Sequence, residues 1–260
     1  MEFVLPYIPN FLLIFCRITS FFVVAPIFST RNVPSQLKLG FSFFVAFLVF
    51  GAVGFGNPLP IDGNYLLLVL REVLIGLALG FISLMFFNIV QVSGAFIDMQ
   101  MGFGIANVID PMTGAQSPII GGFKFIVAVL LFLSFNGHHY LLSAIMDSYQ
   151  WIPLQNDFFS QLAGANVASF MVQSFTTMFS LAFQLAAPIV ISMFLTDVGL
   201  GMLARTAPQF NVFVVGVPIK IIVGFLILML ILPGFVHLFS KIFETMFDSM
   251  WQFLRLVGHS

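Results

Sequence analysis

The sequence predicts an all-α polytopic membrane protein, and three observations support this fold class. Of the 260 residues, 60% are hydrophobic and only 7% are charged, whereas soluble domains average about 45–50% apolar and 25% charged residues. The mean hydropathy is +1.10, which is too high for a domain that must present a polar surface to water. The apolar residues also gather in about six runs that are long enough for a membrane-spanning helix, which requires roughly 20 residues, and several runs exceed this length.

In chain order, the predicted spans are Leu5–Phe28, Leu39–Gly56, Tyr65–Val92, Pro118–Phe135, Val167–Leu195 and Val212–Val236. Pro188 lies inside the fifth span and should bend it or free a backbone carbonyl. The chain starts MEFVLPYIPN, without a basic residue. We therefore expect no cleaved signal peptide, and a first span that stays in the mature protein. Nothing marks a second domain, so residues 1–260 are expected to form one membrane-embedded unit.

Two further regions differ from the spans. The connector 136–166 carries His138, His139 and Asp147, and we expect it to be wet and only partly ordered. In the tail, residues 237–260, apolar residues recur at helical spacing and polar residues fill the other face, which predicts an amphipathic C-terminal helix. Such a helix lies on a membrane surface or packs against a neighbouring subunit. Packing onto its own chain is the third option.

Composition and motifs exclude several function classes. The net charge of −1 argues against a nucleic-acid partner. Cys16 is alone, so no disulfide or cysteine metal site is available. His138 and His139 are adjacent and diverge on a helix, without other ligands at suitable spacing. Neither a G-K-[ST] phosphate loop nor a G-x-S-x-G nucleophile motif occurs. We therefore expect no enzyme activity, no cofactor and no metal.

A few charged residues lie inside or beside the spans. Arg17 is near the middle of the first span, too deep to snorkel to water, so we expect a buried pair with a carboxylate or, less favoured, a transport role. The neighbours Arg71 and Glu72 point to different helix faces and are expected to anchor the third span at the interface. Asp197 and Arg205 are about 12 Å apart on a straight helix, too far for a direct bond.

The longest break in the apolar pattern is IDMQMGFGIANVIDPMTGAQSPIIGG, which runs from Ile97 to Gly122 and contains two aspartates, two prolines and five glycines. Pro111 and Pro118 prevent one continuous helix. Asp98 and Asp110 would each cost roughly 2.5–3.5 kcal/mol at a bilayer centre. Irregular backbone at membrane depth is tolerated only inside protein or along a watery cavity, so this break should avoid lipid.

The side chains of the break alternate. Ile97, Met99, Met101, Phe103 and Ile105 are apolar, and the residues between them are small or polar. An extended backbone would present the apolar set as one edge, and methionine repacks easily. An apolar edge of methionine and phenylalanine on a glycine-hinged backbone is therefore a candidate soft seal across a pore. We assign this seal to the region 93–122, with the candidate residues Met99, Met101, Gly102, Phe103, Gly104, Ile105, Asp110 and Pro111. An ordinary inter-helix loop with methionines as core filler remains the alternative.

Three motifs carry a resemblance to a known family. NVIDPMTGAQSP (Asn107–Pro118), FNGHHYLL (Phe135–Leu142) and ARTAPQFNVFVVGVPIK (Ala204–Lys220) resemble, in this order, the FliR/SctT family of type III export gate proteins. The likeness extends over nearly the whole chain. The NGHH sequence is more similar to the flagellar branch than to the injectisome branch.

The resemblance implies a subunit of a closed, cone-shaped assembly with FliP-type, FliQ-type and FlhB-type partners in the bacterial inner membrane, at the flagellar basal body. Unfolded flagellar proteins would pass through its centre, and membrane lipids would surround it. The central loop would plug the channel, and long helices could bend into hairpins. The same resemblance implies that the region of Asp197, Arg205, Pro208, Gln209 and Asn211 is part of the assembly core, and we expect assembly contacts there. Arg17 is expected to make an assembly contact for another reason, because its depth in the first span means that it should face a partner chain or a cavity.

Two other functions compete. A proton-coupled secondary transporter could use Asp98, Asp110 and Asp197, since carboxylates beside broken helices are its usual ingredients. However, no internal repeat is apparent. An intramembrane aspartyl protease would need a G-x-G-D element, but here Gly102-Phe103-Gly104 is followed by Ile105.

Overall fold

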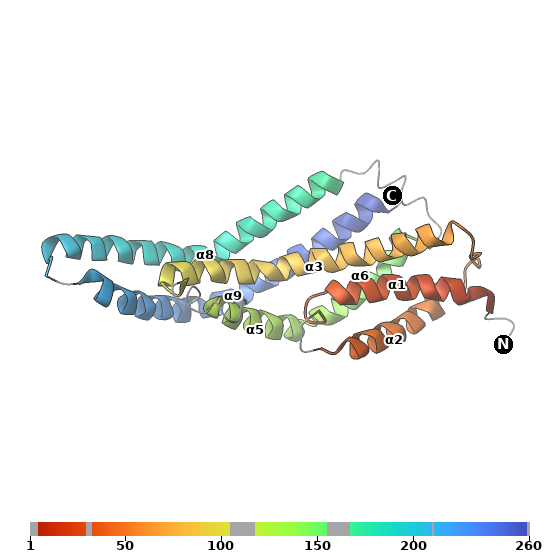
Figure 1. Ribbon diagram of the computed structural model, residues 1–260, viewed down its shortest axis with the longest axis horizontal. Helices are drawn as coiled ribbons and strands as arrows, with labels where there is room; N and C mark the ends of the chain where they lie inside the picture. Colours follow the sequence, from red (N-terminus) through yellow and green to blue (C-terminus); the bar gives the residue numbers. More distant parts are fainter. Residues whose placement is uncertain (1–4, 30–32, 105–117, 155–166, 210, 259–260) are drawn as a thin grey trace. The chain divides into compact units, whose positions relative to one another are not determined.

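The computed structural model describes residues 5–29, 33–104, 118–154, 167–209 and 211–258, and every regular element in these ranges is a helix. In chain order they are η1 (Leu5–Tyr7), α1 (Ile8–Val24), α2 (Ser35–Val53), α3 (Tyr65–Met101), α5 (Ile119–Ser134), α6 (Gly137–Trp151), α8 (Val167–Thr206) and α9 (Val212–Val257) (Figure 1). Within the described part of the chain, 5 helices are long and apolar enough to cross a membrane, or up to 6 if α5 and α6 form one broken span. The predicted fold class is confirmed.

Helix α3 is longer than predicted. It continues past Val92 to Met101, through residues assigned above to the irregular break. The stretch Ser93–Met101 contains no proline, so no backbone N–H is lost and the helical hydrogen bonds continue. Gly102 follows with a φ of +89°, a backbone conformation that glycine adopts without a Cβ clash.

The connector 136–166 contains a regular helix, α6, so the expectation of a partly ordered excursion is wrong for residues 137–151. Asn136 precedes the helix with a φ of +57°, a left-handed conformation that asparagine tolerates well. The buried residues Leu141, Ala144, Ile145 and Ser148 follow a helical repeat. The histidines and Asp147 hid this repeat in the overall composition of the segment.

The C-terminal tail is the end of α9, a helix of 46 residues with Pro218 and Pro233 inside it. Of the three placements considered, the structure has the third, packing onto the same chain. Met246, Met250 and Leu254 are fully buried. Near them the ring of Phe247 contacts Tyr140, and that of Phe253 contacts Phe170.

By their internal contacts, the residues form two compact units. The first unit comprises Met1–Met85, Asn136–Ser174 and Glu244–Ser260. In it, α1 and α2 pack through aromatic rings, with Phe11 set edge-on against Phe43 and Phe50. Gly76 brings α3 close to α1, because a Cβ there would collide with the hydroxyl of Ser20.

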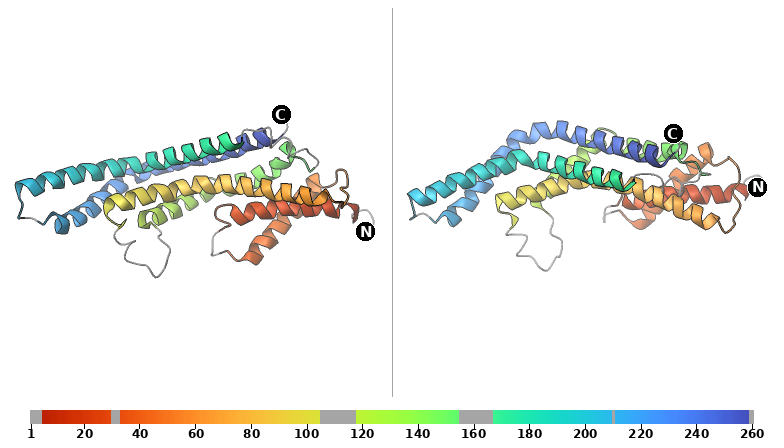
Figure 2. Two further views of the ribbon diagram at one scale, coloured as in Figure 1. Left: turned by 45° about the horizontal axis from the view of Figure 1, so that its top comes forward. Right: turned by 90° about the horizontal axis from the view of Figure 1, so that it is seen from above.

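The second unit comprises Phe86–Phe135 and Phe175–Phe243. Its parts of α8 and α9 lie side by side as a hairpin (Figure 2). Its core unites four helices through a cluster of buried side chains: Ile97, Met101, Ile120, Ala186, Ile189, Met193 and Leu228. Helices α3 and α5 touch through their backbones, because a Cβ on Gly94 would overlap the backbone of Gly121. Small residues at such a crossing are typical of helix packing in membranes.

Gly94→Ala should therefore destabilise the protein, by about 1–3 kcal/mol for an overpacked contact, although alanine favours helices more than glycine does. Gly122→Ala is the matched control, because a Cβ at Gly122 meets nothing within 4 Å. Thermal unfolding of the purified protein in mild detergent is the measurement. Equal unfolding midpoints for the two variants would contradict the close α3–α5 contact.

Candidate functional site

The predicted seal residues begin on the last turn of α3 rather than on an extended strand. Ile97 and Met101 are both fully buried, whereas Met99 between them is 77% exposed. Residues four apart share one helix face and residues two apart do not. The predicted apolar edge is therefore wrong for residues 97–101, where Met99 points away from Ile97 and Met101.

Met101 and Phe103 fix the end of α3 to the core of the second unit. A Cβ on Gly224 of α9 would collide with the thioether of Met101, so the methionine fills the space that this glycine leaves open. Phe103 packs against the buried cluster, with its ring centroid 6.4 Å from that of Phe225. The sequence analysis did not identify Gly224, because the sequence of one helix does not indicate which side chain of another helix packs against its glycine.

Of the remaining seal residues, the structure describes only Gly102 and Gly104. Gly102 and Gly104 follow α3, and Gly104 is the last described residue before the gap. Ile105, Asp110 and Pro111 lie outside the described residues. The seal assignment of all eight residues stays a prediction.

Asp98 and Lys124 connect the two helices that flank the predicted loop. Asp98 is 1% exposed, and its Oδ1 accepts a hydrogen bond from the backbone N–H of Ile120, 3.1 Å away. Lys124, also 1% exposed, donates from Nζ to Ser93 Oγ at 2.9 Å. Sequence reasoning overlooked Lys124, although a single lysine within an apolar span was a visible signal.

The expected assembly contacts in the 197–211 region are mostly exposed. Asp197 forms an ion pair with Lys220, and Arg205, Pro208 and Gln209 are exposed. Asn211 precedes α9 and accepts hydrogen bonds from the N–H of Val214 through its backbone and side-chain oxygens, at 3.0 and 3.4 Å. Two of the possible transporter carboxylates thus have different partners: Asp98 accepts from the backbone of Ile120, and Asp197 pairs with Lys220.

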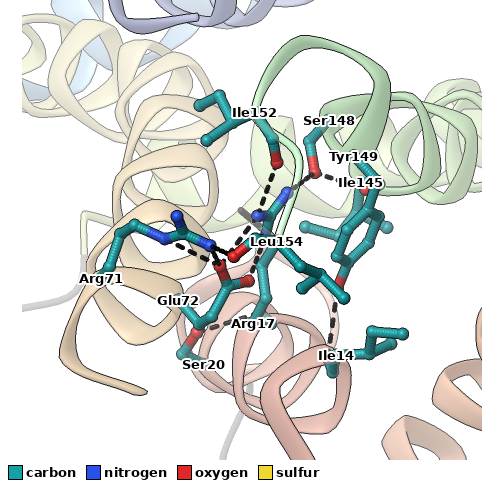
Figure 3. Close-up of polar contacts among 10 residues, drawn as sticks. All are labelled: Ile14, Arg17, Ser20, Arg71, Glu72, Ile145, Ser148, Tyr149, Ile152 and Leu154. Atoms are coloured by element: carbon teal, nitrogen blue, oxygen red, sulfur yellow. Dashed lines mark hydrogen bonds and ion pairs between the residues drawn. The ribbon is translucent and has the colours of Figure 1, made fainter. Parts of the chain in front are cut away.

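Arg17 lies in a buried polar cluster of the first unit (Figure 3). Its side chain and that of Glu72 are both 0% exposed, with Arg17 Nε 2.6 Å from Glu72 Oε2 and Nη2 3.0 Å from Oε1. The buried pair with a carboxylate is therefore the correct reading of Arg17, and the guanidinium reaches this partner from α1 to α3. An assembly role for Arg17 would have to act through the packing of its own unit.

The same cluster holds the end of α6. Arg17 donates to Ser148 Oγ at 3.0 Å and to the carbonyl of Ile152 at 2.9 Å, and it lies 4.0 Å from the ring centroid of Tyr149. Tyr149 in turn donates to the carbonyl of Ile14 at 3.2 Å. Helices α1, α3 and α6 thus meet at one guanidinium (Figure 3).

Arg71 and Glu72 are also part of this cluster, so the expectation that they anchor at the interface is wrong. Arg71 Nη2 donates to Glu72 Oε1 and to the carbonyl of Leu154, both at 2.7 Å. The expectation considered only the helix face on which each residue lies. A long arginine side chain can nevertheless bend along its own helix and reach the next residue.

Glu72→Ala should lower stability strongly, by about 3–5 kcal/mol, because it leaves buried guanidinium groups without their anion. Asp62→Ala is a suitable comparison. Asp62 is exposed and accepts from the N–H groups of Asn64 and Tyr65 at the start of α3, and loss of such a cap costs about 0.5–2 kcal/mol. Thermal unfolding in detergent should rank the two variants in this order, and the reverse order would refute the role of Glu72.

Comparison with known proteins identifies the family of the chain. The profile of the family described as "Bacterial export proteins, family 1" matches residues 8–246. Flagellar biosynthetic protein FliR of Bacillus subtilis is 46% identical over 260 residues, which is 100% of both chains. The protein of the same name from Escherichia coli is 32% identical over 237 residues, 89% of each chain. The chain therefore belongs to the bacterial export protein family 1.

Proposed function

We propose that the chain is a non-catalytic subunit of the flagellar type III protein export gate, where it helps to form and seal the channel for unfolded flagellar proteins. The single observation that carries this proposal is the 46% identity to a protein named flagellar biosynthetic protein FliR, over the full length of both chains. The match of residues 8–246 to a family of bacterial export proteins also supports it.

The proposed setting is the bacterial inner membrane at the flagellar basal body, with FliP-type, FliQ-type and FlhB-type subunits as partners. The exposed surface of the second unit supports a membrane or subunit environment. Helices α8 and α9 expose large apolar side chains, among them Phe183, Phe194, Leu195, Met229 and Leu230. Apolar surface of this extent requires lipid or other hydrophobic chains to cover it.

In this proposal, the region 93–122 closes the channel and is displaced when a substrate passes. Met101 and Phe103 are occupied in the core of their own unit, so they hold the base of the seal. Among the apolar seal residues that the structure describes, Met99 has the exposed side chain. It would pack against neighbouring subunits when the channel is closed. Its flexible thioether side chain can repack when the neighbours move.

Met99→Ser should therefore make cells leak ions or small solutes, while assembly and folding stay normal. Met202→Ser is the matched control, because Met202 is a similarly exposed methionine of the same unit, 66% against 77% for Met99. Uptake of a small membrane-impermeant solute by intact cells is the measurement. Wild-type permeability in a normally assembled Met99→Ser variant would argue against the seal.

Purification in gentle detergent tests the assembly itself. A gate subunit should co-elute with two other small hydrophobic proteins and should be inactive alone. If the chain instead elutes alone as a monodisperse species and catalyses pH-driven uptake in liposomes, the transporter hypothesis would replace the gate.

A further inference from the structure

Helices α3 and α5 enter and leave the predicted seal region, and their contact is fixed by one side chain. Ile120 is in the first turn of α5, where backbone N–H groups have no acceptor within their own helix. Pro118 precedes the helix and provides no side-chain cap. Asp98 of α3 supplies the missing acceptor through Oδ1, 3.1 Å from the Ile120 nitrogen. The end of one helix is thus tied to the start of the next.

The acceptor of this hydrogen bond is an acidic side chain in an apolar surrounding. Asp98 is 1% exposed, and its second oxygen, Oδ2, is buried without a hydrogen-bond partner. Lys124 follows Ile120 by one helical turn, about 6 Å along the axis of α5, and therefore shares its face. Its Nζ lies 4.8 Å from the ring centroid of Phe235. The carboxylate of Asp98 and the ammonium group of Lys124 interact electrostatically, so each offsets part of the cost of burying the other.

The backbones leave little freedom at this place. Gly94 and Gly121 are in direct contact, and a Cβ on Gly94 would overlap the backbone of Gly121. The hydrogen bond from Lys124 to Ser93 adds a second polar tie on the same helix pair, at 2.9 Å. The contact between α3 and α5 is therefore held at three successive places: Asp98 with Ile120, Gly94 with Gly121, and Ser93 with Lys124.

We propose that Asp98 is the positioning residue of the seal. It fixes the two ends of the loop as one base, so that a displaced loop returns to the same place, and Lys124 supplies the charge that keeps the carboxylate buried. The proposal rests on the proposed sealing function, but the tie itself can be measured without any export.

A pair of double variants separates the hydrogen bond from the charge. Asp98→Asn/Lys124→Met and Asp98→Leu/Lys124→Met are both free of charge at these positions and have side chains of similar size at position 98. Only asparagine retains an oxygen that can accept from Ile120. Hydrogen exchange of the Ile120 amide, measured by mass spectrometry on the purified full-length protein, should be at least tenfold faster in the leucine variant. The asparagine variant should remain near the wild type.

Cell permeability is the second readout. The leucine variant should leak small solutes while its amount in the membrane stays normal, and the asparagine variant should restore the seal. Asp248→Asn, which alters an exposed carboxylate on α9, is the control and should change neither measurement.

Equal exchange of the Ile120 amide in the two double variants would overturn the tie. Different exchange with equal, wild-type permeability would overturn its positioning role. Failure of the sealing function itself is recognised separately, because Met99→Ser would then be silent whatever the exchange at Ile120. If the double variants fold poorly, the single variants Asp98→Asn and Asp98→Leu provide the same comparison with Lys124 still present, and equal exchange there would also refute the tie.

Discussion

In a chain with so few charges, each fully buried charged side chain that the structure describes is hydrogen-bonded to another polar group of the same chain, because an unpaired charge in an apolar surrounding costs several kcal/mol. Arg17 and Glu72 satisfy this constraint in the first unit, with bonds of 2.6 and 3.0 Å between fully buried groups. The position of α6 depends on it, since the donors that Glu72 leaves over are taken by Ser148 and the Ile152 carbonyl.

The second unit meets the same constraint differently. Its helices approach so closely at Gly94 and Gly121 that polar groups from one helix reach the backbone or side chains of the next. Asp98 takes up an amide at the start of α5, and Lys124 reaches Ser93. One unit therefore relies on a dense cluster around a guanidinium, and the other on separate ties along a helix pair.

Much of the fold could be predicted from composition and run length, because both follow from the environment rather than from particular contacts. The buried ion pair of Arg17 was also predictable, since the residue is too deep to reach water. Its partner was not, because Glu72 lies 55 residues away and only packing brings them together. The end of α3 was predicted wrongly because the alternation from Ile97 to Ile105 fits an extended strand, yet nothing between Ser93 and Met101 interrupts a helix. The placement of the tail stayed open among three options, because an apolar helix face does not reveal what covers it.

The side chain of Met101 fits against α9 because residue 224 is a glycine, which has no Cβ atom there. The volumes at positions 101 and 224 are therefore linked. Among natural variants of this chain, a larger residue at position 224 is expected to occur with a shorter one at position 101, and a pair of large residues should be rare. Variation at two sites more than a hundred positions apart in the sequence would then record a single contact.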